Sequence, residues 1–204
     1  MRTSRPFSDD NSASGGGVKT ASGSESIKEE NDMTPTEELK HEHKVVLLVL
    51  DGAQKQIVPP EGPESSTMDE MIEFFVNFVD RCHHTKEEKY FFPKLEEHGV
   101  PREGGPIGVM LNEHNQGRKL VAAMKKEISA NDRKSLKKDL LNYIQLLRSH
   151  INKENEVLFV MADKVLTKEE QQALSTAFAA VEAEEMGEGV HEKYHQLAHR
   201  LAAQ

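Results

Sequence analysis

The sequence predicts an all-α protein in which an up-down-up-down four-helix bundle is followed by extra C-terminal helices. Three observations lead to this fold class. The composition has no tryptophan, 5% aromatic and 30% charged residues, which is typical of a soluble helical protein. Four long stretches repeat apolar residues at the spacing of a helix face. The connections between them are short, which favours antiparallel neighbours.

The chain divides into three expected parts. Residues 1–32 are rich in Ser, Gly, Asp and Glu with almost nothing apolar, so we expect a disordered tail. Helical order is expected to begin where Thr34 and Glu37 form a capping box. The bundle is expected to occupy residues 33–163, and a helical extension residues 164–204.

Turn and capping signals place the helices in order. Pro and Gly clusters and an Asn-Asp turn separate four long helices, which we expect at about 34–56, 67–98, 106–130 and 133–161. A capping box at Thr167 and Glu170 starts a fifth helix that reaches about Glu185. Two glycines then precede a last amphipathic piece, His191 to Leu201.

The apolar faces of the four long helices are interrupted by polar side chains. Burying one unpaired ionised group is expensive, so several such groups make sense if they meet and are neutralised together. One histidine alone on an apolar face is usually a hydrogen-bonded core residue, and the interpretation depends on their coincidence. The candidate metal ligands are His43, His83, Glu87, His114, His150 and Glu154.

Two of the helices carry the pattern His-x-x-x-Glu, at His83 with Glu87 and at His150 with Glu154. This spacing stacks both side chains on one helix face, with Cβ atoms roughly 5–6 Å apart. The second and fourth helices of an up-down bundle run parallel, so the two pairs can face each other. A single such pair is usually a surface pair, whereas two pairs on apolar faces predict a site built from several helices.

The donor set predicts the metal. Four imidazoles and two carboxylates are too many ligands for one tetrahedral zinc ion. They suit two iron ions joined by an oxo or hydroxo bridge, with manganese as the second choice, because nitrogen and oxygen donors are mixed. Each ion would keep room for an exogenous small molecule such as O₂, NO or peroxide.

Several neighbouring residues are expected to lie outside the site. His84 is rotated by about 100° from His83 on an α-helix, so we expect His83 inside and His84 and Glu88 outside. Glu42 and Glu113 directly precede predicted ligands and are expected to face solvent.

Other features of the sequence limit the range of possible functions. The net charge of −9 argues against nucleic acid or an anionic membrane as the main partner, and no apolar run is long enough to span a bilayer. Cys82 is the only cysteine, which makes a reducing cytoplasm the default compartment, and we expect it to be a free thiol that points away from the metals. His191-Glu192-x-x-His195 matches a zinc-protease pattern, but we expect an amphipathic tail helix, or a lid over the metal site.

Four motifs together resemble a known family. They are Glu42-His43, His83-x-x-Lys86-Glu87-Glu88 with Phe91-Phe92-Pro93, Glu113-His114-x-x-Gly117-Arg118, and His150-x-x-Lys153-Glu154 with Leu158-Phe159. Over about residues 34–163 the chain resembles the hemerythrin-like, HHE cation-binding proteins. The resemblance implies a non-haem di-iron centre with Glu87 and Glu154 as bridging carboxylates. That family includes oxygen carriers, oxygen or redox sensors, nitric-oxide-responsive iron–sulfur repair proteins and peroxide-consuming members.

Two departures from the oxygen carriers refine this expectation. Arg118 stands where those proteins have a second histidine on the third helix, and Glu154 replaces an aspartate five residues after the histidine. The resemblance then implies a more symmetric centre of four His and two carboxylates, closer to the bacterial branch associated with nitric oxide and iron handling.

Three functional hypotheses remain. The leading one is a di-iron protein that binds, senses or detoxifies O₂, NO or peroxide. The second is a non-catalytic, metal-dependent regulatory or iron-handling protein that acts through a protein partner. The third is a structural bundle in which the six polar residues merely pair. The sequence leaves open whether the protein is an enzyme.

Overall fold

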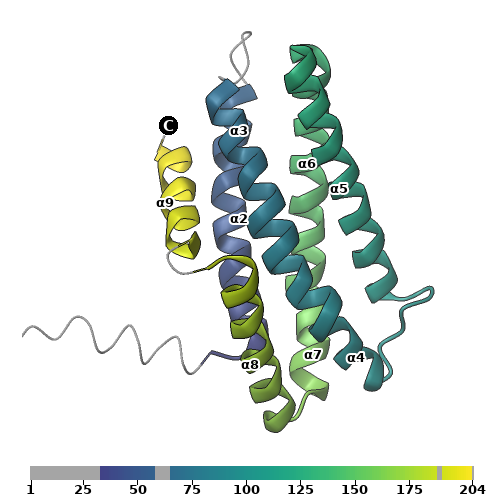
Figure 1. Ribbon diagram of the computed structural model, residues 1–204. Coiled ribbons are helices and arrows are strands. Elements are labelled where there is room, and N and C mark those ends of the chain that lie inside the picture. The colour runs from purple at the N-terminus through teal and green to yellow at the C-terminus, as the bar shows by residue number, and fades with distance from the viewer. Residues whose placement is uncertain (1–32, 58–64, 188–189, 204) are drawn as a thin grey trace, which may run out of the picture. The chain divides into compact units, whose positions relative to one another are not determined.

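The computed structural model describes residues 33–57, 65–187 and 190–203. Within these ranges all regular secondary structure is helical and no strand occurs, as Figure 1 shows. The predicted all-α fold is therefore confirmed. The predicted disordered tail, residues 1–32, lies outside the described residues.

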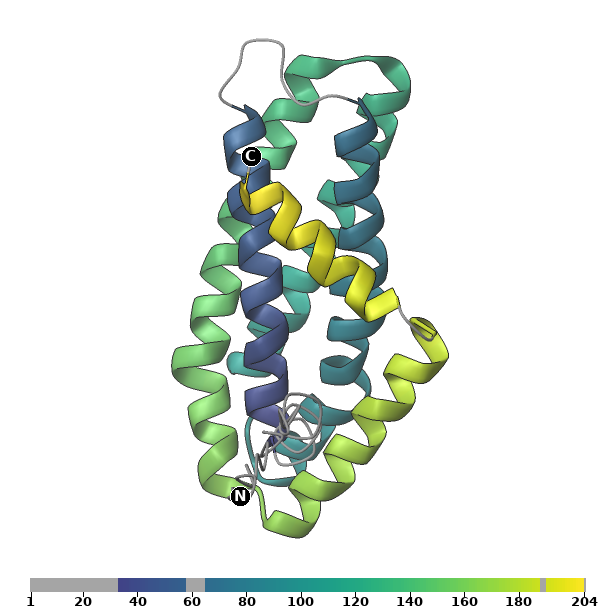
Figure 2. The same ribbon diagram turned by 90° about the vertical axis from the view of Figure 1, so that its left-hand side faces the viewer.

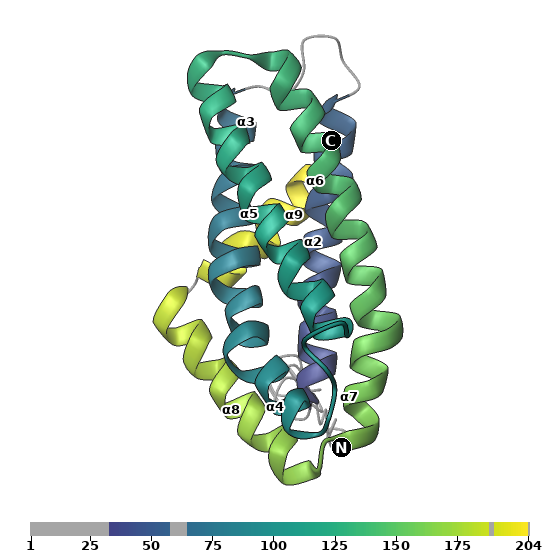
Figure 3. The ribbon, with the colours of Figure 1, turned by 90° about the vertical axis from the view of Figure 1, so that its right-hand side faces the viewer.

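Four long helices form the bundle, and neighbours in the sequence run antiparallel (Figures 1 and 3). The first and third are the single helices α2, Pro35–Ile57, and α5, Pro106–Ala130. The second and fourth are continuous but change their helix type along their length. The second consists of α3 (Ser65–Phe74), η1 (Phe75–His84), η2 (Glu87–Phe91) and α4 (Phe92–Glu97), and the fourth of α6 (Arg133–Lys153), η3 (Glu154–Leu158) and α7 (Phe159–Val165).

Local sequence signals explain where these helices begin and end. Thr34 and Glu37 exchange the two hydrogen bonds of a capping box, at 2.8 and 3.3 Å, at the start of α2. Asn131 ends α5 in the left-handed conformation, at φ 54°. Asp132 then caps α6 by accepting a hydrogen bond from the Ser135 N–H at 3.1 Å.

The segments η1, η2 and η3 are π-helical, with wider turns than an α-helix. They begin or end at the predicted ligands, because His83 closes η1 together with His84, Glu87 opens η2 and Glu154 opens η3. π-helical turns occur frequently at functional sites. A wider turn rotates each residue by less than an α-helical step, which changes the inward face of the second helix.

Two further helices pack against the bundle. The helix α8, Lys168–Glu185, begins at the predicted capping box of Thr167 and Glu170. The helix α9, Val190–Ala203, lies across α2 in Figure 2 and contacts it. Gly52 permits this contact, because a Cβ atom there would lie only 2.6 Å from the Leu201 Cβ.

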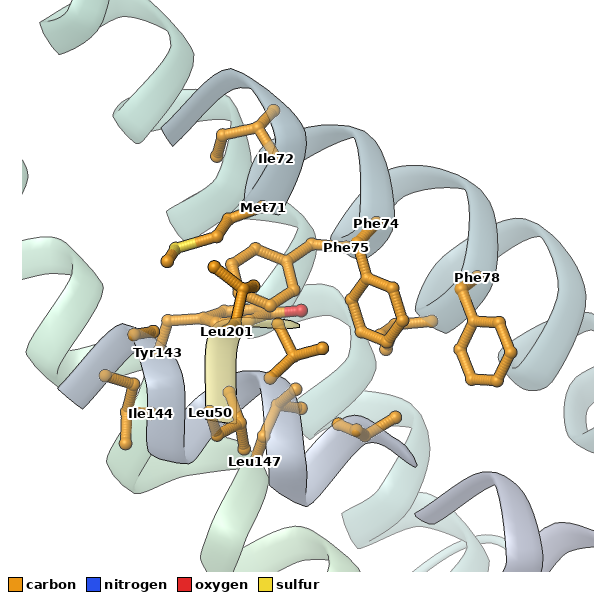
Figure 4. Close-up of a cluster of buried hydrophobic side chains, with 14 of the residues drawn as sticks. Leu50, Met71, Ile72, Phe74, Phe75, Phe78, Tyr143, Ile144, Leu147 and Leu201 are labelled. Atoms are coloured by element: carbon orange, nitrogen blue, oxygen red, sulfur yellow. The ribbon is translucent and has the colours of Figure 1, made fainter. Parts of the chain in front are cut away.

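The apolar interior forms two clusters that lie on opposite sides of a polar layer. The larger cluster contains Leu50, Phe75, Phe78 and Tyr143 and is shown in Figure 4. The smaller one surrounds Phe159 near the other end of the bundle. Between the two clusters, every long helix turns polar residues inward, so the apolar packing on both sides fixes the positions of these polar side chains.

Within residues 33–57, 65–187 and 190–203, no helix combines the length and the apolar composition needed to cross a membrane.

Candidate metal centre

The six predicted ligands lie together in the polar layer. The side chains are all buried, and the most exposed of them, His83, has only 2% of its surface accessible. α2 and α5 each contribute one histidine, and the second and fourth helices each contribute a His-x-x-x-Glu pair.

The four imidazoles form two close pairs. His43 Nε2 lies 3.0 Å from His83 Nε2, and His114 Nε2 lies 3.1 Å from His150 Nε2. Two neutral imidazoles cannot both present a lone pair at this distance without repulsion. A proton or a metal ion between the nitrogens of each pair removes that repulsion.

The two glutamates connect the histidine pairs. One Glu87 oxygen lies 3.6 Å from His83 Nε2 and the other lies 3.4 Å from His114 Nε2. Glu154 Oε2 lies 3.2 Å from both His43 Nε2 and His150 Nε2. Each carboxylate therefore reaches both pairs, which is the arrangement a bridging ligand requires.

The carboxylate oxygens give a test of whether metal ions fit. Both oxygens of Glu87 and both oxygens of Glu154 are buried and receive no hydrogen bond. Buried carboxylates normally have hydrogen-bond donors or a metal ion. Glu87 belongs to two groups of donor atoms, each spanning at most 4.8 Å, one with His43, His83 and Glu154 and the other with His84, His114 and His150. The residues therefore fit two cations that share a carboxylate.

A second layer of residues orients the imidazoles. Each Nδ1 has an oxygen acceptor: Asn155 for His43 at 2.9 Å, Glu42 for His83 at 2.6 Å, Glu88 for His114 at 2.7 Å and Glu113 for His150 at 3.0 Å. A proton on Nδ1 leaves the Nε2 lone pair pointing at the centre, which is the tautomer that binds a metal.

These contacts correct three expectations. Glu42 is 2% exposed, and Glu113 also turns inward, so neither has the predicted position in solvent. Glu88 is partly buried and holds His114 instead of lying outside. The repeated sequence Glu-His, with the glutamate directly before a ligand, was the signal that could have identified Glu42 and Glu113.

His84 is also buried, at 3% exposure, and the expectation that it lies outside is wrong. The π-helical turn of η1 places two consecutive histidines on the inward face. The ring of His84 stacks on His114 with 3.7 Å between centroids and an 18° angle between planes. His84 Nδ1 lies 3.3 Å from Asp80 Oδ1, and its buried Nε2 has no hydrogen-bond partner.

Arg118 contributes to the second layer rather than to the ligand set. Its guanidinium donates hydrogen bonds to Asp80 and to Glu88, both at 2.7 Å. Those two carboxylates hold His84 and His114, respectively. Arg118 therefore fixes the acceptors of two neighbouring imidazoles.

Lys86 is fully buried beside the first histidine pair. Its Nζ donates hydrogen bonds of 2.6 Å to Glu38, Glu42 and Glu182. Burial alone would lower the pKa of Lys86, but these carboxylates raise it above its ordinary value. Because Glu182 belongs to α8, the extension is connected to the acceptor of His83.

The pKa values report the charges in the metal-free site. Burial would raise the pKa of Glu42, but Lys86 and His83 lower it to about 2. Burial would lower the pKa of His114, but the nearby carboxylates of Glu87 and Glu88 raise it to about 9. Burial and the adjacent His114 hold the pKa of His84 well below its ordinary value. Without metal, a proton on His114 therefore partly neutralises the carboxylates, whereas His84 stays neutral.

Two other sequence features have different outcomes. Cys82 is buried in the larger apolar cluster, and burial raises its pKa, so it is an unreactive free thiol. His195 lies in α9, and its ring is 5.6 Å from that of His41 rather than in the metal centre. The described part of α9 therefore packs as the predicted tail helix.

Comparison with known proteins is consistent with this site. Residues 31–162 match the family described as Hemerythrin HHE cation binding domain. The chain is 26% identical over 171 residues to uncharacterized proteins of Mycobacterium bovis and of two strains of Mycobacterium tuberculosis. The alignment covers 79% of this chain and 66% of each relative, so the chain spans slightly less than two thirds of their length. The comparison with solved structures gave no significant match.

Proposed function

Because this chain belongs to the hemerythrin HHE cation binding domain family, we propose that it is a non-haem di-iron protein that binds, senses or detoxifies O₂, NO or peroxide. Residues 33–163 would form the metal-binding module and residues 164–204 an extension that modulates it. The lone buried cysteine fits a reducing compartment such as the cytoplasm.

One observation carries the proposal. Two pairs of facing imidazole nitrogens, about 3 Å apart, are joined by four buried carboxylate oxygens that receive no hydrogen bond. His43 and His83 would hold one ion, and His114 and His150 the other. Glu87 and Glu154 would bridge them.

The donor set favours iron, with manganese as the second choice, because imidazole and carboxylate donors are combined without thiolate. Iron supplies redox chemistry and an affinity for small diatomic molecules. The chain's own residues keep the imidazoles in the metal-binding tautomer, exclude bulk water and balance the charge of the carboxylates. Asn155, Glu42, Glu88 and Glu113 hold the proton on each Nδ1.

Metal analysis of the purified full chain tests the assignment. After anaerobic loading with iron we expect about two metal ions per chain. His83→Ala should reduce the content, and Glu154→Ala should remove most of the metal because it removes a ligand from both ions. A content below about one ion per chain that is unchanged in both variants would support the structural bundle instead.

Optical spectra of the iron-loaded protein then identify the ligand. The spectrum is first recorded under anaerobic conditions. O₂, NO or peroxide is then added to separate samples, and the spectral change and its reversal under vacuum are recorded. Reversible binding indicates a carrier or sensor, whereas irreversible consumption indicates detoxification.

The link between Lys86 and α8 favours a second candidate function, a metal-dependent regulator that acts through a protein partner. Glu182 of α8 and Glu42 beside His83 share the same buried ammonium group. Metal loading that alters His83 could therefore alter how α8 docks. A partner whose affinity depends on metal, in a protein that turns over no peroxide, would favour this candidate.

A further inference from the structure

The six candidate ligands are closed off from solvent, so a metal ion can reach them only when part of the surrounding wall opens. None of these residues has more than 2% of its surface exposed. The carboxylates that hold the imidazoles differ in their access to solvent: the Glu42 side chain is 3% exposed, that of Glu113 14% and that of Glu88 29%. Among these carboxylates, Glu88 between the second and third helices is therefore the one that an ion in solution reaches most easily.

Asp80 lies in the same part of the wall as Glu88, and one arginine connects the two carboxylates. The Arg118 guanidinium donates hydrogen bonds to Asp80 Oδ1 and to Glu88 Oε1, both at 2.7 Å. The same two oxygens also face imidazole nitrogens further inside, His84 Nδ1 at 3.3 Å and His114 Nδ1 at 2.7 Å. The two carboxylates therefore hold a cationic group between them, with the imidazoles of the metal centre directly behind.

His84 provides a nitrogen between this wall and the candidate ligands. It is 3% exposed, and its buried Nε2 has no hydrogen-bond partner. Because its Nδ1 faces the Asp80 carboxylate, the ring proton belongs on Nδ1 and Nε2 carries a lone pair. A ring nitrogen of His84 lies within 4.8 Å of donor atoms of His114 and His150. His84 thus has an unused metal-binding atom at the inner side of the wall.

The stacking geometry keeps His84 from sharing an ion with His114. An imidazole binds a metal through a lone pair that lies in the plane of its ring. The two rings are 3.7 Å apart and inclined by only 18°, so one ion cannot lie in both planes. The arrangement suits a nitrogen that binds an ion before His114 does and releases it afterwards.

The charges around this wall determine whether it attracts a metal cation. A cleft of about 160 Å³ adjoins the wall and is lined by Asp80, Arg118 and Lys125, among others. With Arg118 in place its charge is engaged by both carboxylates, and Lys125, exposed on the same helix, adds a further positive charge. If the Arg118 side chain, which is 36% exposed, moves out into solvent, Asp80 and Glu88 lose their shared counterion. The position of Arg118 therefore decides whether the local field repels or attracts a cation.

We propose that Asp80, Glu88 and Arg118 form the entry gate through which divalent metal ions reach the centre. Arg118 moves outward, the two carboxylates capture the hydrated cation, and His84 passes it to His114. Ferrous iron and manganese(II) both suit this route, because each binds to carboxylates and imidazoles. The inference rests on the proposed di-iron function and adds the way in which its centre is loaded.

The rate of metal uptake by the metal-free full chain tests the gate. Ferrous iron is added anaerobically, a chelator stops the uptake at set times, and the bound iron is measured. Arg118→Met should speed the uptake about three- to tenfold, because it frees both carboxylates and removes a positive charge. Lys153→Met is the matched control, because its side chain is equally exposed, at 36%, and it neutralises the acceptor of a different ligand, His150. An acceleration in Lys153→Met as large as that in Arg118→Met would overturn the proposal.

Two double variants test whether the carboxylates attract the ion. In the Arg118→Met chain, adding Asp80→Asn should reverse most of the acceleration. Adding Asp69→Asn, which removes an exposed carboxylate from the same continuous helix, should preserve it. A loosened bundle opens more often and would take up iron faster, so a slower uptake cannot come from lost stability. Similar rates in the two double variants would exclude Asp80 from the route.

His84→Phe tests the inner step. It keeps a ring against His114 but has no lone pair, so the uptake should slow about tenfold while the final iron content equals that of the wild type. A lower final content would make His84 a permanent ligand, and an unchanged rate would remove it from the route; either result contradicts the proposal. If the wild-type chain binds no iron, the proposed function itself fails. A wild-type content of about two ions with equal rates in all variants would refute the gate alone.

Discussion

The two halves of the bundle build the same half-site twice, in different surroundings. Glu42-His43 and His83-x-x-Lys86-Glu87 in the first half correspond to Glu113-His114 and His150-x-x-Lys153-Glu154 in the second. In each half the glutamate accepts hydrogen bonds from the paired histidine and from the lysine. The repeated contacts show that the motif specifies a histidine, its acceptor and the cation that neutralises the acceptor.

The surroundings of the two lysines differ most. Lys86 is fully buried and serves three carboxylates, one of them from α8. The Lys153 side chain is 36% exposed and pairs with Glu113. The first half is therefore covered by the extension, whereas the second half lies closer to solvent.

His43 and His114 each find their hydrogen-bond acceptor in the other half of the bundle, and the two acceptors differ in charge. The residue after each of the two buried glutamates, Glu154 and Glu87, supplies the acceptor: neutral Asn155 for His43 and anionic Glu88 for His114. His84 follows His83, whereas apolar Ile151 follows His150. The two halves share a motif but differ in their surroundings, because the residues next to the motif set the local charge and the access to each candidate metal position.

Removing the two lysines should give the largest contrast. Lys86→Met leaves three carboxylates around a buried site without their cation, so it should destabilise the metal-free protein by about 3–5 kcal/mol. Lys153→Met should change the stability by only about 0–1 kcal/mol, because water screens its ion pair. Denaturant unfolding monitored by circular dichroism measures both. Equal losses of stability in the two variants would show that the deeper burial of Lys86 does not make its ion pairs more important than that of Lys153.

Neutralising the acceptors should weaken metal binding in both halves. Glu42→Gln and Glu113→Gln each remove the carboxylate that orients a ligand histidine, and each should reduce iron affinity by about 10- to 100-fold. We expect Glu42→Gln to have the larger effect because it also leaves Lys86 with one carboxylate fewer. Competition with a chelator gives the affinities. A loss of iron affinity in only one of the two variants would contradict the idea that Glu42 and Glu113 have the same role in the two halves.

Making the acceptor of His43 anionic and the acceptor of His114 neutral should shift the reduction potential in opposite directions. Asn155→Asp adds an anion near His43 and should lower the reduction potential of the iron centre, whereas Glu88→Gln should raise it. A charged rather than a neutral acceptor changes a hydrogen bond by about 1 kcal/mol, which corresponds to about 40 mV for one electron. Spectroelectrochemical titration measures the shift, and shifts of the same sign would refute the electrostatic origin.

The smallest expected effect belongs to the extension. Glu182→Gln removes one of the three anions around Lys86, and the Glu182 side chain is 37% exposed. The thermal stability should fall by no more than about 1 kcal/mol, because two carboxylates remain and solvent screens this one. A loss as large as that of Lys86→Met would mean that α8 holds the first half-site together.

Helical periodicity predicted the fold and the six candidate ligands, because apolar packing and ligand spacing both follow it. The helix boundaries at Thr34, Asn131 and Thr167 followed from capping and turn chemistry. The same periodicity gave the wrong position for His84, because it assumes an α-helical rotation where the chain is π-helical. A π-helical turn depends on tertiary packing and has no simple sequence signature.

The second layer was missed for a related reason. Glu42 and Glu113 lie one residue from predicted ligands, and a rotation about one helix alone placed them in solvent. Each reaches a histidine on the neighbouring helix instead, so the relevant geometry exists only between two helices. Comparing the two halves of the sequence would have indicated a shared role for these glutamates.

The π-helical segments also bear on how the backbone fluctuates. π-helical turns are rare interruptions of the α-helical hydrogen-bond pattern, and η1, η2 and η3 adjoin the residues proposed to hold metal. Amide protons there should exchange with solvent faster than those of α2 or α5 in the metal-free protein. Metal would tie these turns to the opposite helices, so the backbone that holds the ligands would gain the greatest protection from exchange.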